Sequence, residues 1–384
     1  MDDPTPDTMD GPTPLARAAE KGDMEVVRML LERNDVDPDA IDWHEGKTPL
    51  WRAAYNGHDR IVRMLLERGN VNPNRTDKCG KLTPLACAAR SGHARVVRIL
   101  LKRDDVNPDL VDWDDITPLS WAARNGHGWV VMTLLERRDI NPNAAPEDCR
   151  TPISWAAGRG HVEMVRMLLE RKDVNPNTAD QNGRTPLSWA AGNGREEVVR
   201  ILLQRNDVDP DPIDCHLQTP LVFAAQFGDE RIMRILLGRG NVNPDRSDKY
   251  GRTALSWAAG CGHVRAVRVL LERNDVNPDT PDRDGRTPLS LAAQGGSPGV
   301  PQIQMAMCRP YHDRAHDNCR PISFSCGDGK GHEEVVRILL ERDKVNPNKL
   351  DKYGQTPLTL AARRGCKAIV KMLEVKNVLL SQQT

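Results

Sequence analysis

The densest set of metal-ligating side chains in this sequence is Cys308, His312, His316 and Cys319, which fall within a single short segment. Thiolate and imidazole groups suit the tetrahedral preference of zinc, so these four residues are a candidate metal site. Their spacing matches no zinc-finger pattern, and an irregular loop is the main alternative. The sequence therefore predicts no metal and no cofactor, with this segment as the weak exception.

Two other patterns match enzyme motifs only in part. Residues 327–331 read Gly-Asp-Gly-Lys-Gly, which lacks the spacing that lets a phosphate-binding loop cradle phosphate ahead of a helix. His332 and Glu333 begin like a zinc-protease motif, but Val336 stands where the second imidazole is required. We expect a protein that is not an enzyme.

Composition narrows the class further. The 54 basic side chains equal the 54 acidic ones, which argues against binding of nucleic acid through bulk charge. No apolar run is long enough to span a membrane, and the start at Met1 lacks the order of a signal peptide. The nine cysteines include no C-x-x-C pair, so reduced thiols are expected. These features predict a cytoplasmic protein, with the nucleus as the alternative, and no nucleic-acid or membrane partner.

The elements that carry these residues come from a repeat. Thr-Pro-Leu or a close variant recurs ten times, at intervals of 34 or 35 residues and a final interval of 69. The threonines that open the repeats are Thr13, Thr48, Thr83, Thr117, Thr151, Thr185, Thr219, Thr253, Thr287 and Thr356. Because the final interval of 69 residues corresponds to two periods, about eleven repeats fill the chain. A fixed period of this length indicates a repeat architecture.

The repeat that begins at Thr185 shows the local chemistry. Thr185 caps a short helix, and Pro186 suits its first turn because proline lacks the N–H that would stay unpaired there. Gly194 ends this helix, and a second amphipathic helix follows until Pro210 stops it. Each repeat therefore predicts two antiparallel helices and a loop that turns outward.

The consensus Asp-x-x-Gly-x-Thr-Pro-Leu-x-x-Ala-Ala-x-x-Gly-His-x-x-Val-Val-x-x-Leu-Leu-Glu resembles the ankyrin repeat across essentially the whole chain. The resemblance implies an all-α fold, an ankyrin-repeat α-solenoid of about eleven helix-turn-helix units with outward loops. Serine usually replaces the family's histidine after Thr-Pro-Leu, as at Ser120 and Ser154. The style is similar to the long fungal ankyrin arrays that are attached to NACHT-type proteins, although no such module is present in this sequence.

Six histidines occupy equivalent places, each after a glycine at the start of a second helix: His58, His93, His127, His161, His263 and His332. Successive repeats separate them by about 10 Å, which is too far for shared metal ligation. We expect them to cap helices and brace loops.

Tryptophans form a stripe along the first helices, at Trp121, Trp155, Trp189 and Trp257, with Phe223 between the last two. Stacking between adjacent repeats is the favoured interpretation, because aromatic pairs gain from burial. In particular, Trp155 and Trp189 are expected to pack on each other's repeats. Binding of a partner is the alternative.

The groove positions of the first helices are biased toward positive charge. Lys21, Arg90, Arg124, Arg159, Arg363 and Arg364 are opposed there only by Glu20, which suits an acidic or phosphorylated protein segment. Reversal of Arg90, Arg124 and Arg159 is expected to leave the fold intact, since exposed substitutions cost little. The other candidate contacts are aromatic, because aromatic anchors carry much interface energy: Trp43, Tyr55, Trp113, Phe227, Tyr250 and Tyr353.

The repeat also predicts the domain organisation. Residues 1–12 form a tail, residues 13–296 a block of about eight and a half repeats, and residues 332–384 the last repeats and a cap. Residues 297–331 are an irregular insertion or a decayed repeat, because their removal restores a 34-residue interval.

The function expected from these features is a non-catalytic, monomeric scaffold that binds a protein partner along its groove and loop tips. A sensor array split from a NACHT-type switch protein is the first alternative. A metal-binding or enzymatic role of residues 308–326 is the second.

Overall fold

The computed structural model describes residues 11–42, 44–145, 150–295 and 330–382. These residues form twenty helices and no strand, which confirms the all-α fold. They are arranged as ten pairs of helices, and the eleventh unit expected from the spacing would fall in residues 296–329, outside the described part of the chain. Two compact units, Met1–Gln181 and Asn182–Thr384, divide the chain.

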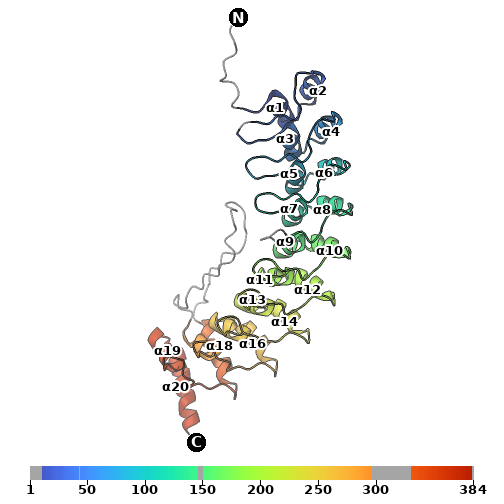
Figure 1. The fold of residues 1–384 in the computed structure, drawn as a ribbon. Helices are drawn as coiled ribbons and strands as arrows, with labels where there is room; N and C mark the ends of the chain where they lie inside the picture. Colours follow the sequence, from blue (N-terminus) through green and yellow to red (C-terminus); the bar gives the residue numbers. More distant parts are fainter. Residues whose placement is uncertain (1–10, 43, 146–149, 296–329, 383–384) are drawn as a thin grey trace. The chain divides into compact units, whose positions relative to one another are not determined.

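Each pair consists of a first helix that begins at or just after Thr-Pro-Leu and a second helix that follows it. The first unit contains the pairs α1 (Pro14–Lys21) and α2 (Met24–Glu32), α3 (Pro49–Asn56) and α4 (Asp59–Glu67), α5 (Pro84–Ser91) and α6 (Ala94–Leu100), α7 (Pro118–Asn125) and α8 (Gly128–Leu135), and α9 (Pro152–Arg159) and α10 (Val162–Glu170). The second unit contains α11 (Pro186–Gly192) and α12 (Glu196–Gln204), α13 (Pro220–Phe227) and α14 (Glu230–Leu237), α15 (Ala254–Gly260) and α16 (Val264–Leu271), α17 (Pro288–Ala293) and α18 (Lys330–Leu340), and α19 (Pro357–Arg364) and α20 (Lys367–Ser381). Within each unit, first helices pack on first helices and second helices on second helices, so that two rows run side by side (Figure 1).

The Thr-Pro start of a first helix is a cap in the structure. In α7, Thr117 Oγ1 accepts the N–H of Ser120 at 3.1 Å, and Pro118 occupies the first helical position. The Thr117 hydroxyl also donates to Ser120 Oγ at 3.1 Å, so the serine pairs with the cap inside the buried interface. Gly126 ends the helix with φ 76°, a left-handed conformation that glycine adopts without strain.

A buried aspartate holds most of the described outward loops. Asp112 Oδ1 accepts the N–H groups of Asp114 at 3.0 Å and Ile116 at 2.9 Å. These bonds close the turn that precedes Thr117 and satisfy loop N–H groups that would otherwise be buried unpaired. The second oxygen of Asp112 remains available for a side chain of the following helix.

The histidines brace neighbouring repeats and do not cap their own helices. His93 occupies the N-cap position of α6 without a side-chain capping bond, and its Nε2–H donates to Tyr55 O in the preceding repeat at 3.0 Å. His127 reaches Arg90 O in the same way at 3.0 Å. The expected capping of their own helices is therefore wrong, and the histidines brace the last turn of the neighbouring first helix, not a loop.

Helix α18 takes the second-helix place of the repeat that α17 begins, since it packs against both α17 and α16. His332 lies in its first turn and donates from Nε2 to Gly260 O at 3.1 Å, as the other histidines do. The repeat that begins at Thr287 therefore obtains its second helix from Lys330–Leu340. The boundaries of the segment between the two helices stay a prediction.

Candidate partner-binding surface

Arginine and tryptophan side chains alternate along the first helices of unit Met1–Gln181. Arg90 lies over the Trp121 ring with its guanidinium carbon 4.4 Å from the ring centroid. Arg124 lies between two indoles, 5.0 Å from the Trp121 centroid and 4.5 Å from the Trp155 centroid. Arg150 covers Trp155 at 4.5 Å. Each contact is a cation–π interaction, so the stack joins three successive repeats.

This packing corrects the expectation for Arg124. Its side chain is only 7% exposed, because the two indoles enclose it. Reversal of Arg124 to Glu would place a carboxylate between two aromatic faces, which the fold cannot accept at the small cost of a surface change. Arg124 acts first as part of the packing between repeats.

The stripe of tryptophans is largely buried, as a structural role predicts, and Arg124 lies between the rings of Trp121 and Trp155. Trp121, Trp189 and Trp257 are each 5% exposed. The indole N–H of Trp121 donates to Asp112 Oδ2 at 2.7 Å, and that of Trp257 donates to Asp248 Oδ2 at 2.9 Å. Helix and outward loop are thus joined by one buried bond.

Trp155 differs from the other members of the stripe. It is half-buried, and its indole nitrogen is buried without a hydrogen-bond partner among the described residues. The sequence accounts for this, because Pro146 stands at the place that Asp112 and Asp248 hold before their repeats. Trp155 and Trp189 belong to different units, so their mutual packing stays a prediction.

Two candidate contact residues next to the stack are accessible. Tyr55 is 48% exposed and stacks on Trp51 with ring centroids 5.2 Å apart. Arg90 is exposed, and no carboxylate of the described part of the chain lies within ion-pair distance of it. Arg159, at the end of α9, is half-buried. The structure therefore brings Tyr55, Arg90 and Arg159 to the first-helix surface on successive or nearby helices.

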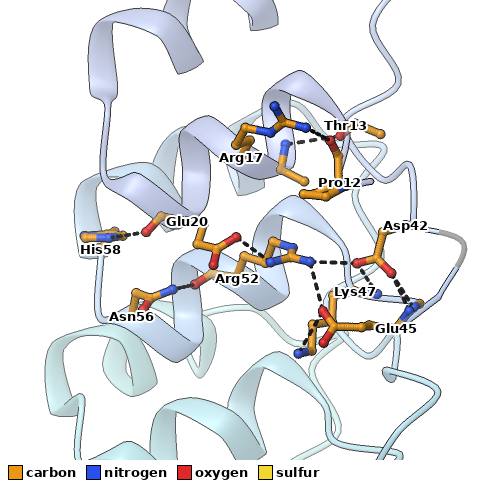
Figure 2. Close-up of polar contacts among 12 residues, drawn as sticks. Pro12, Thr13, Arg17, Glu20, Asp42, Glu45, Lys47, Arg52, Asn56 and His58 are labelled. Atoms are coloured by element: carbon orange, nitrogen blue, oxygen red, sulfur yellow. Dashed lines mark hydrogen bonds and ion pairs between the residues drawn. The ribbon is translucent and has the colours of Figure 1, made fainter. Parts of the chain in front are cut away.

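A buried ion network lies at the N-terminal end of the same row, and sequence reasoning missed it. Arg52 donates to Glu20, to Asp42 Oδ2 at 2.9 Å and to Glu45 Oε2 at 3.0 Å (Figure 2). Burial opposes the charge on Asp42, but Arg52 and the loop N–H groups outweigh it, so the pKa of Asp42 is lowered. The sequence contained a signal for this network. Arg52 occupies the place in its repeat that Trp121 holds two repeats later, so an arginine was to be expected at a buried position.

In unit Asn182–Thr384 the candidate residues do not form one stack. Phe227 is half-buried at the end of α13, whereas Arg363 and Arg364 are exposed at the end of α19. Tyr250 and Tyr353 are exposed on two outward loops, and Lys249 Nζ lies 5.0 Å from the Tyr250 ring centroid. Of the aromatic candidates in this unit, the two loop tyrosines are exposed, whereas Phe227 is half-buried.

Two tryptophans are the most exposed aromatic side chains among the described residues of the first unit. Trp113, on an outward loop, is 67% exposed, as a loop-tip contact requires. Trp129, at the start of α8, is 73% exposed and was missed. Its signal is positional, because Arg60, Arg95 and Glu163 hold the equivalent place in neighbouring repeats. Trp43 lies outside the described residues.

Metal and membrane sites can be assessed only for the described residues. Among them, no group of three or more His, Cys, Asp or Glu side chains is placed to hold a metal ion. The zinc candidates Cys308, His312, His316 and Cys319 all lie in residues 296–329, which the structure does not describe. Within the described residues, every helix is too short or too polar to cross a bilayer.

Comparison with known protein families identifies the array. The model for ankyrin repeats (3 copies) matches residues 2–77, 69–146, 142–214, 221–303 and 301–378, which together cover nearly all of the sequence. No curated protein matches the chain. The paired helices, the Thr-Pro caps and the outward loops agree with this match, and the chain belongs to the ankyrin repeat family.

Proposed function

We propose that this chain is a non-catalytic protein-interaction scaffold that binds an acidic or phosphorylated segment of a partner on its first-helix surface. Ankyrin repeats are generally protein–protein interaction modules, and proteins built from them are generally scaffolds without enzymatic activity. A monomeric state and a location in the cytoplasm or nucleus belong to the same proposal.

The observation that carries this proposal is the environment of Arg90. Its guanidinium is exposed, and Trp121 holds it from one side at 4.4 Å. No carboxylate of the described chain pairs with it. A guanidinium that is already held in place loses little conformational freedom on binding, and it offers its N–H groups to a carboxylate or phosphate in a bidentate manner.

The surroundings of Arg90 favour an anionic guest. Tyr55 lies one repeat before it and presents an exposed ring, which is a suitable anchor for an apolar or aromatic residue of the partner. Glu20, the only acid counted among the groove positions, is paired with Arg52. Glu20 is therefore not available to neutralise the guanidinium of Arg90.

The proposal is tested with a charge reversal on each row of helices. The full chain serves as bait, its partner is identified by mass spectrometry, and the affinity of that partner is measured for Arg90→Glu and Arg98→Glu. Arg98 is the matched control, because it is an exposed arginine on the second helix of the same repeat.

We expect Arg90→Glu to weaken binding at least about tenfold, or about 1.4 kcal/mol, and Arg98→Glu to have little effect. Phosphatase treatment of the partner then separates a phosphorylated segment from an acidic one. Equal losses for the two variants, or none for Arg90→Glu, would contradict binding through the first-helix surface.

A further inference from the structure

An exposed cysteine in the second unit is placed beside an imidazole and an ammonium group. Cys215 and His216 lie on the loop between α12 and α13, and Lys249 lies on the loop between α14 and α15. Cys215 Sγ is 3.4 Å from His216 Nδ1, and Lys249 Nζ is 3.2 Å from the same nitrogen. The backbone N–H of Lys249 also donates to His216 O at 2.8 Å, which joins the two loops.

These three groups favour a reactive thiol. The nucleophile of cysteine chemistry is the thiolate, and a nearby cation or base increases its population at neutral pH. His216 Nδ1 lies 3.4 Å from the sulfur, and because this nitrogen has one lone pair it takes the thiol proton only when Lys249 does not donate to it. Lys249 approaches the same nitrogen, so its positive charge also lies close to the sulfur and favours the anion.

The nearest carboxylates are already engaged. Asp214 accepts the N–H groups of His216 and Gln218, both at 2.8 Å. Asp248 accepts the N–H of Tyr250 at 2.8 Å and the indole N–H of Trp257 at 2.9 Å. Hydrogen bonds from these N–H groups partly neutralise the two carboxylates. They therefore oppose a thiolate at Cys215 less than unpaired carboxylates would.

We propose that Cys215 is a modification site that reacts with low-molecular-weight disulfides of the glutathione class. The Cys215 thiolate attacks one sulfur of the small disulfide, a new S–S bond forms to Cys215, and the original S–S bond breaks. The released small thiolate carries away the electron pair and takes a proton from solvent or from the His216 imidazolium. The disulfide is the oxidant, and the step balances without any other reactant.

The adduct would have a local effect on the surface. Lys249 contacts His216 and also lies over the exposed ring of Tyr250. A bulky group on Cys215 that displaces Lys249 changes the surroundings of Tyr250.

The chain contains its own control. Cys79 is also exposed on an outward loop, but no imidazole of the described residues lies within hydrogen-bond distance of it. Lys78 and Lys81 lie close to Cys79 in the sequence, so it controls for positive charge alone. Cys87 is buried, and burial raises the pKa of its thiol, so it should be inert.

The test uses the full reduced chain and a limiting amount of glutathione disulfide at pH 7, with the modification of each cysteine followed by peptide mass spectrometry. We expect Cys215 to react several-fold faster than Cys79, because only Cys215 has an imidazole and an ammonium group beside it. His216→Gln and Lys249→Met should each slow Cys215 toward the rate of Cys79. Circular dichroism checks that both variants keep their helices. Equal rates for Cys215 and Cys79, or a Cys215 rate that neither variant changes, would overturn the proposal.

Discussion

A row of hydrogen bonds links the loop ends of successive repeats, and it leads to a specific prediction about stability. In two repeats an asparagine makes two bonds to the next repeat. Asn74 Oδ1 accepts the N–H of Asn107 at 2.9 Å, and Asn74 Nδ2 donates to Asp105 O at 2.6 Å. Asn143 makes the same pair of bonds, with Asn175 N at 2.7 Å and Asp173 O at 2.6 Å.

Aspartate at this place can make only one of the two bonds while it is ionised. Asp109 Oδ2 accepts the N–H of Asn141 at 2.9 Å, and Asp245 Oδ2 accepts that of Asn277 at 2.9 Å. The Oδ1 atom of each is buried and has no partner among the described residues. Burial raises the pKa of both carboxyl groups, as expected for a charge that lacks compensation.

We therefore expect Asp109→Asn to stabilise the array. The amide nitrogen would take the place of the unpaired Oδ1. It could then donate to a backbone carbonyl of the next repeat, as Asn143 Nδ2 donates to Asp173 O. A net hydrogen bond contributes about 0.5–1.5 kcal/mol, and relief of a buried unpaired polar group about 1–3 kcal/mol. An increase of about 1–3 kcal/mol in the free energy of unfolding at pH 7 follows from these ranges.

Urea denaturation at several pH values measures this effect, and Asn143→Asp is the matched reverse substitution. Because the folded-state pKa of Asp109 is raised, its carboxyl gains a proton, and with it a donor, as pH falls through that pKa. The advantage of Asp109→Asn should accordingly be complete at pH 7 and shrink in acid. A variant no more stable than the parent chain at pH 7, or Asn143→Asp without cost, would refute the reasoning.

Three further predictions concern residues whose roles the structure defines. Burial lowers the pKa of His263 and His332, so the stability that they contribute should be complete above about pH 6.5 and fall as pH drops through their folded-state pKa, as melting curves from pH 7.5 to 5 would show. Trp121→Phe removes the donor to a buried carboxylate and should cost about 1–3 kcal/mol more in urea denaturation than Trp155→Phe, whose indole nitrogen has no acceptor in the described part of the chain. Arg52→Met leaves Asp42 and its neighbouring acids without their cation and should lower the unfolding free energy by about 3 kcal/mol, measured in the same way.

Much of the fold follows from the sequence because the repeat specifies each local element. Thr117 as a cap, Pro118 in the first turn and Gly126 at the end are chemical requirements of one short helix, and the structure confirms each of them. Burial of Trp121 follows in the same way from its regular place in the stripe. Residues whose role is local were therefore predictable.

The side-chain environment of the surface was less predictable, because it depends on the next repeat. Arg124 looks like an exposed cation when its own helix is considered, but Trp155 from the following repeat covers it at 4.5 Å. Arg52 is neutralised by acids from its own repeat and the one before. A charge in an array can be assigned to the surface only after both neighbouring repeats have been placed against it.

The same argument explains which aspartates have a cation as compensation at Oδ2, while Oδ1 of Asp39 and Asp279 stays without a partner among the described residues. Asp39 and Asp279 face a cation supplied by the next described repeat, Arg75 at 2.9 Å and Lys349 at 3.2 Å. Asp109 and Asp245 lack this compensation, since Ala144 and Thr280 stand at the equivalent places.

A cation at residue 280 should therefore act on the same carboxyl group as an amide at residue 245, through the other oxygen. Thr280→Arg would pair with the Asp245 carboxylate, whereas Asp245→Asn would remove its charge. Because Thr280→Arg has no carboxylate to pair with once Asp245→Asn has removed it, the stabilisation of the double variant should be clearly smaller than the sum of the two single effects, by the logic of a double-mutant cycle. Additive stabilisation in urea denaturation would mean that the two side chains do not meet, and that the register between these repeats differs from the one in the structure.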